Sequence, residues 1–172
     1  MKNTVLLTTL TVLALVALTG SRQLGGAGHA DSLSNPPDRI DLTVNSTTVK
    51  VDPSTQTVSV EDTFTVDIVV EDTYDLVGYK FTLEVDSTTV SIEGVEDGGF
   101  LESTGRSAVI ITEDYGPGSV EFAVVSVGDT SGPSGTGTLA VVTLYAAQEG
   151  TSLLDLSEVE VAESGFSVLP VD

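Results

Sequence analysis

The sequence lacks cysteine and tryptophan, and its one histidine, His29, lies in the N-terminal fifth of the chain. Without thiols the chain has no disulfide framework and no thiolate nucleophile. A Ser-His-Asp triad or a histidine-based zinc site would have to use His29, which falls within the leader described below. The sequence also contains neither the glycine loop of P-loop proteins nor the dinucleotide-binding fingerprint. These absences predict that the protein is not an enzyme.

Basic residues are also scarce, with six Lys and Arg against 26 Asp and Glu, for a formal net charge of −20. Binding to nucleic acid needs clustered Lys and Arg, so nucleic acid is excluded as a partner. An anionic membrane surface is excluded for the same reason. The acids are scattered along the chain, which is typical of a solvated surface whose self-repulsion concentrated salt would screen. We therefore predict a salt-loving (halophilic) source.

Aromatic residues make up only 5% of the chain, which disfavours stacking platforms for sugars. A glycosidase needs two carboxylates at a defined separation, one with its pKa raised by burial. Here the acids fall mostly in turns or on polar strand faces, which disfavours glycosidase activity. Acidic pairs near turns offer oxygen ligands for calcium, although none has EF-hand spacing. Calcium binding and solvated acidic turns both stay open, and no other cofactor is expected; the pairs are Glu71-Asp72, Glu96-Asp97 and Glu113-Asp114.

Residues 1–30 have the features of a signal peptide. Lys2 supplies a minimal positive region, and residues 5–18 form an apolar stretch. The small residues of GAGHA, which end at Ala30, give a plausible peptidase site. The apolar stretch is short for a membrane span, which needs about 20 residues. We predict a secreted or cell-surface protein with no membrane insertion after leader removal, and a retained N-terminal anchor is the alternative.

A short polar segment separates the leader from the predicted domain. Residues 31–43 include Pro36-Pro37 and show no periodicity, which predicts a linker or flexible start. The domain spans residues 44–172. Near its start, Asn45-Ser46-Thr47 is an N-glycosylation sequon, so Asn45 is a candidate glycosylation site.

From residue 40 onward the sequence predicts short β-strands separated by turns rich in glycine and acidic residues. Residues 138–147 are apolar on both faces, which predicts a central or doubly covered strand. The spacing predicts an all-β fold, an antiparallel β-sandwich with jelly-roll topology and about nine strands. One or two strands, broken at Asp52-Pro53, are expected within residues 40–60. The others are expected at 63–70, 77–85, 89–95, 108–112, 120–127, 138–147, 152–156, 159–162 and 168–171.

The segment 77–85 alternates most clearly between apolar and polar residues, as expected of a strand with one wet face. Lys80 lies on the polar side and can pair with Glu84, or with Glu121 if the two strands are neighbours. The alternative interpretation is that this polar side is a docking surface. The apolar side holds Val77, Tyr79, Phe81, Leu83 and Val85, and the polar side holds Gly78, Lys80, Thr82 and Glu84.

Five segments, in order along the chain, together resemble a cohesin domain, the module of cellulosome scaffolds. The segment LVGYKFTLEVD is similar to the family's LYGYQFTLSYD strand, and GTGTLAVVTL is similar to its GSGTLATITF strand. The resemblance extends from about residue 44 to residue 171. The five segments are VEDTFTVDI (60–68), LVGYKFTLEVD (76–86), VEDGGFL (95–101), GTGTLAVVTL (135–144) and GTSLLDLS (150–157).

The resemblance implies a nine-stranded jelly roll that binds the dockerin module of a partner protein and has no catalytic activity. It also implies a role in polysaccharide breakdown and places the partner surface on the sheet that contains 77–85. Two positions depart from the family, where Asn and Asp often bond the dockerin but Gly78 and Lys80 stand here. Direct carbohydrate binding and a structural role in the cell envelope remain the alternatives. The expected partner-binding face comprises Gly78, Lys80, Thr82, Glu84, Glu121, Ala123 and Val125.

Overall fold

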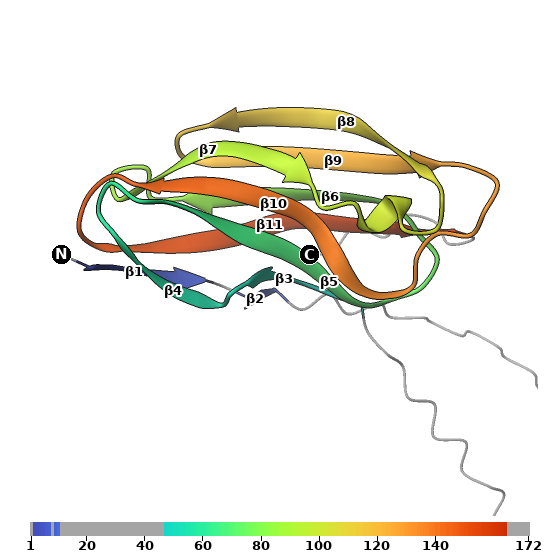
Figure 1. The fold of residues 1–172 in the computed structure, drawn as a ribbon, viewed down its shortest axis with the longest axis horizontal. Coiled ribbons are helices and arrows are strands. Elements are labelled where there is room, and N and C mark those ends of the chain that lie inside the picture. The colour runs from blue at the N-terminus through green and yellow to red at the C-terminus, as the bar shows by residue number, and fades with distance from the viewer. Residues whose placement is uncertain (1, 8, 11–46, 165–172) are drawn as a thin grey trace, which may run out of the picture. The chain divides into compact units, whose positions relative to one another are not determined.

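Alternating apolar and polar residues fold the chain into two facing β-sheets. The computed structural model describes residues 2–7, 9–10 and 47–164, and these residues belong to one compact unit. One sheet has the strand order β4-β1-β11-β6-β9-β8 and is here called sheet A. The other, sheet B, has the order β2-β3-β5-β10-β7. Figure 1 shows the two layers, and the predicted all-β sandwich is confirmed.

Nine of the described strands lie within residues 48–163, which matches the expected number. Consecutive strands mostly cross from one sheet to the other, as in a jelly roll, and β8 and β9 form a hairpin within sheet A. One short 3₁₀ helix, η1 (Phe100–Glu102), follows β7. The nine strands are β3 (Thr48–Asp52), β4 (Thr55–Ser59), β5 (Thr63–Thr73), β6 (Leu76–Val85), β7 (Val90–Asp97), β8 (Ser107–Gly116), β9 (Ser119–Val127), β10 (Gly135–Ala146) and β11 (Thr151–Glu163).

Two further strands come from the segment that the sequence assigns to the leader. β1 (Lys2–Leu7) lies between β4 and β11, parallel to β11, and β2 (Thr9–Leu10) pairs with β3. Cleavage at residue 30 stays a prediction. The linker at 31–43, the sequon residue Asn45 and the expected strand at 168–171 lie outside the described residues.

The strands between residues 48 and 146 begin and end within a few residues of the expected positions. The chain leaves β3 in sheet B and enters β4 in sheet A at Asp52-Pro53, where proline removes a backbone donor from the ladder. β10 is central in sheet B, between β5 and β7, as its two apolar sides predict. Within β6 the first fully buried side chain is Leu76, while Val77, expected inside, is only half-buried.

The prediction of separate strands at 152–156 and 159–162 is wrong, because one strand, β11, covers both. Its register against β6 shifts between Ser157 and Glu160, and Glu158 has φ 48°. A bulge of this kind reverses the phase of alternation, so Leu156 and Val159 both point into the core although they are three residues apart. The alternation of apolar and polar residues is therefore interrupted at Glu158, although the strand continues through it.

The core fills the space between the two sheets. Sheet A contributes an aromatic cluster of Tyr79, Phe81 and Phe122, with ring centroids 6.1–6.4 Å apart. Sheet B contributes aliphatic residues such as Ile68 and Leu144, both fully buried. The Tyr79 hydroxyl is satisfied by two acceptors, Asp97 Oδ1 at 2.7 Å and the carbonyl oxygen of Leu139. This polar contact joins β6 to the end of β7 and to β10.

Candidate functional site

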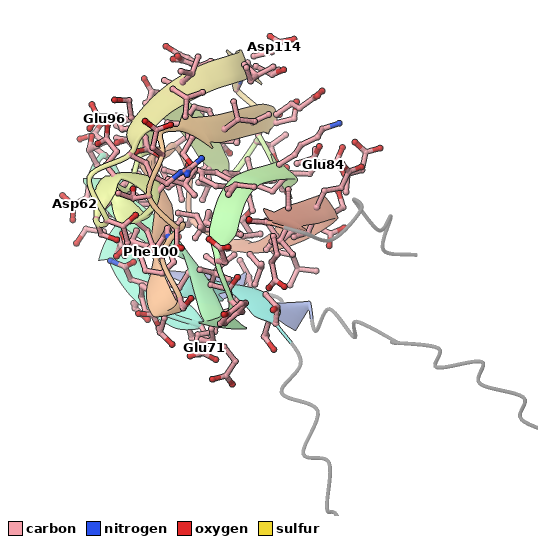
Figure 2. The ribbon with its side chains drawn as sticks, turned by 90° about the vertical axis from the view of Figure 1, so that its right-hand side faces the viewer. Asp62, Glu71, Glu84, Glu96, Phe100 and Asp114 are labelled. Carbon is pink, nitrogen blue, oxygen red and sulfur yellow. The ribbon has the colours of Figure 1, made fainter. Side chains whose placement is uncertain are left out.

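The register between β6 and β9 brings the seven predicted residues of the face together. Gly78 lies opposite Val125, Lys80 opposite Ala123, and Thr82 opposite Glu121. Glu84 follows on β6, and its carboxylate projects away from the ribbon in Figure 2. All seven therefore lie on the side of sheet A that faces away from the core. We call this side the outer face.

The outer face extends over two strands that the sequence did not assign to it. On β11, Glu160 lies opposite Lys80 and Ala162 lies opposite Gly78. On β8, Val109 lies opposite Val125 and Asp114 lies opposite Glu121. The hairpin signal at residues 116–118 would have indicated the β8 residues. The β11 residues were hidden by the bulge at Glu158.

Lys80 lies near the middle of the outer face and is held by carboxylates of its own chain. Its Nζ lies 3.1 Å from Glu121 Oε1 and 3.8 Å from Glu158 Oε2. Thr82 Oγ1 donates to the same Glu158 carboxylate at 3.3 Å. The hydrogen bond with Glu121, and then its charge, raise the pKa of Lys80 above the usual lysine value. Of the two partners expected from the sequence, Glu121 is the one observed.

One end of the outer face is apolar. Val109, Val125 and Val127 are 43%, 39% and 54% exposed. Val125 lies opposite Gly78, which is buried, and a Cβ at Gly78 would lie 3.2 Å from both Val124 O and Val125 Cγ1. The missing side chain at Gly78 thus leaves room for the Val125 side chain, and Gly78 itself is not exposed. Exposed branched side chains grouped in this way are typical of interaction surfaces.

The other end of the outer face is acidic. Glu84 lies opposite Asp155 of β11, and Glu121 lies opposite Asp114 of β8. The two strand pairs put like charges directly across from each other, which is unfavourable in isolation. A cationic group from outside the chain would relieve that repulsion. No aromatic residue is among those assigned above to the outer face, so this face has no stacking platform for a sugar ring.

Metal ligands and membrane-spanning helices bear on two further points of the sequence analysis. In the described part of the chain, no group of three or more His, Cys, Asp or Glu is arranged to hold a metal ion. Calcium binding and solvated acidic turns therefore both stay open. The same part of the chain contains no helix long and apolar enough to cross a membrane.

Comparisons with known proteins give matches of structure only. No family model and no curated protein match the sequence. The second type II cohesin module of the ScaA adaptor scaffoldin from Acetivibrio cellulolyticus superposes with a TM-score of 0.54 at 15% identity, over 66% of this chain and 82% of that chain. A type II cohesin from Bacteroides cellulosolvens gives 0.51 at 15%, over 66% and 85%.

A third match is the sixth cohesin of Acetivibrio cellulolyticus scaffoldin B, in complex with a mutant Cel5 dockerin. It gives a TM-score of 0.51 at 14% identity, over 67% of this chain and 86% of that chain. The described domain thus has the fold of cohesin modules, in agreement with the resemblance found in the sequence.

Proposed function

We propose that the protein is an exported, non-catalytic binding module that docks a dockerin-type module of another extracellular protein through the outer face. The observation that carries the proposal is the composition of the outer face. Three exposed valines on β8 and β9 lie beside several carboxylates on the same face. Solved cohesins with this fold include complexes with dockerins, which supports a protein partner. A role in polysaccharide breakdown would follow from a partner that carries a hydrolase.

The contacts of the partner should differ from those implied for cohesins in general. Lys80 stands where an acceptor is common, and its ammonium is already engaged by Glu121 and Glu158. A partner side chain that displaces one of these carboxylates must itself offer an acceptor. The three valines supply apolar surface of the kind that is buried in a protein interface.

The experiment is affinity capture on the immobilised chain with secreted proteins of the source organism, followed by calorimetry with the purified partner. The double variant Lys80→Glu with Val125→Asp should reduce affinity by roughly 100-fold, because it adds negative charge and polarity to the middle and the apolar end of the outer face. The matched control is Lys50→Glu with Tyr74→Asp, the same charge changes outside the outer face. Equal affinity for both double variants would refute the outer face as the docking surface.

A further inference from the structure

Two strand edges are left unpaired on the same side of the sandwich. Sheet A ends at β8 and sheet B ends at β7, and no described strand pairs with the outward edge of either. The backbone N–H of Ala108 in β8 points outward, where it donates to Glu102 Oε1 at 3.4 Å. Apart from that engaged amide, an edge with no neighbouring strand offers backbone donors and acceptors to an incoming extended segment.

The edges of β7 and β8 are held together at both ends, and a hollow lies between these ends. At one end the Ile92 N–H of β7 donates to the Pro117 carbonyl oxygen at 3.1 Å. At the other end η1 and its Glu102 approach the start of β8. The hollow between them has a volume of about 520 Å³, within the usual range for ligand sites. We call it the edge hollow; its walls include Glu93, Val95, Glu96, Ile110, Glu113 and Tyr115.

The walls of the edge hollow combine apolar and acidic groups. Ile110 and Tyr115 are 47% and 48% exposed, which is high for large apolar side chains. Glu96 and Glu113 come from opposite walls, and both are exposed. Figure 2 shows Glu96 on the side of the ribbon opposite Glu84, so this hollow is separate from the acidic end of the outer face.

Nothing within residues 47–164 neutralises these carboxylates. The three basic side chains of that part of the chain are all engaged elsewhere. Lys50 pairs with Glu71 at 2.6 Å, Lys80 is held on the outer face, and Arg106 binds the backbone carbonyls of Ser126, Gly128 and Thr130. A second copy of this chain would bring the same net charge of −20, so charge complementarity favours a basic segment of another protein.

We infer that the edge hollow is a second binding site, which takes an extended, lysine- or arginine-bearing segment of a partner protein. The backbone of the segment pairs with the free edge of β8. A basic side chain lays its aliphatic stem on the exposed Ile110 and places its charge between Glu96 and Glu113, beside the Tyr115 ring. This site is independent of the outer face.

The test is an NMR titration of the ¹⁵N-labelled chain with a synthetic heptapeptide that alternates valine and lysine. Amide shifts should change along 93–97 and 108–115, and a valine–glutamine peptide of the same length should bind roughly three- to tenfold more weakly. Shifts confined to the outer face, or no difference between the two peptides, would overturn the inference. Shifts at the hollow with a cello-oligosaccharide but not with the peptides would also overturn it.

Variants separate a specific site from diffuse attraction to an acidic protein. Glu96→Gln with Glu113→Gln should weaken peptide binding by roughly three- to tenfold. Glu149→Gln with Asp129→Asn removes the same charge from turns outside the hollow and should leave it unchanged. Equal losses in the two pairs would overturn the site. Lys80→Glu with Val125→Asp should keep full peptide binding. A failure of the proposed docking through the outer face can therefore be distinguished from a failure of the proposed peptide site in the edge hollow.

Discussion

The two sides of sheet A are made by the same strands but follow different constraints. On the inner side, Tyr79, Phe81 and Phe122 pack with ring centroids 6.1–6.4 Å apart and are nearly inaccessible to solvent. On the outer face, the residues one step along the same strands are small or charged, such as Lys80 and Ala123. The inward-pointing residues therefore determine the fold, and the outward-pointing residues are free of that constraint.

The largest effect should come from truncating the inner side. Phe122→Ala removes a fully buried ring and leaves a cavity against Tyr79 and Phe81, which should lower the free energy of unfolding by about 3–5 kcal/mol. Its neighbour Ala123 lies on the outer face, and Ala123→Ser should change it by less than about 0.5 kcal/mol. Urea unfolding measures both values. Similar costs for the two variants would contradict the division between the sides.

The polar contact of the inner side gives the next largest effect. Tyr79→Phe removes the hydroxyl that donates toward Asp97 and Leu139, and should cost about 1–3 kcal/mol because buried acceptors lose their donor. Tyr74→Phe makes the same chemical change at a residue that is 68% exposed, and should be close to neutral. Urea midpoints of the two variants provide the comparison. A neutral Tyr79→Phe would show that the contact contributes no stability.

The same tyrosine predicts how stability depends on alkaline pH. Burial, followed by the hydrogen bond to Asp97, raises the pKa of Tyr79 far above its usual value. The unfolded chain releases this proton near pH 10 while the folded chain keeps it, so the contribution is complete below pH 10 and is lost as pH rises further. Between pH 9 and pH 11 the wild type should therefore lose more stability than Tyr79→Phe. A larger loss in the variant would contradict this assignment.

The sequence predicted the inner side better than the outer face. Strict alternation in β5, β6 and β9 identifies buried residues directly, and the core matches it almost throughout. The outer face depends on which strands are neighbours, and alternation carries no such information. The β6–β9 register confirmed Glu121 as the partner of Lys80, but Glu158 joined it through a bulge that no periodicity indicates.

The edge hollow lay beyond sequence prediction for a related reason. It depends on two ties between distant segments, Ile92 with Pro117 and Ala108 with Glu102. The acidic pairs at Glu96 and Glu113 were visible in the sequence, but they were candidates for calcium. The structure instead combines them with Ile110 and Tyr115 on the walls of one hollow.

The charge of the outer side and of the turns should make stability depend on salt. The chain has a net charge of −20, and every Asp and Glu that the structure describes is exposed or half-buried, so their repulsion is screened at high ionic strength. The melting temperature should rise from 0.1 M to molar sodium chloride, by roughly several degrees if screening contributes about 1–2 kcal/mol. Calorimetry in sucrose is the control, since sucrose favours the compact state without screening. Equal gains in sucrose and salt would exclude the electrostatic explanation.

The smallest effect on stability is expected at the centre of the outer face. Lys80→Gln removes an exposed ion pair with Glu121 and Glu158, and such pairs contribute little to stability and are screened by salt. Because Glu121 raises the pKa of Lys80, the contribution is complete below about pH 10.4 and is lost as pH rises through the folded value. Urea midpoints of wild type and variant should thus converge both in molar salt and at high pH. If the outer face is the docking surface, affinity for the partner should change more than stability does. A variant that loses stability but keeps affinity would assign Lys80 to the fold.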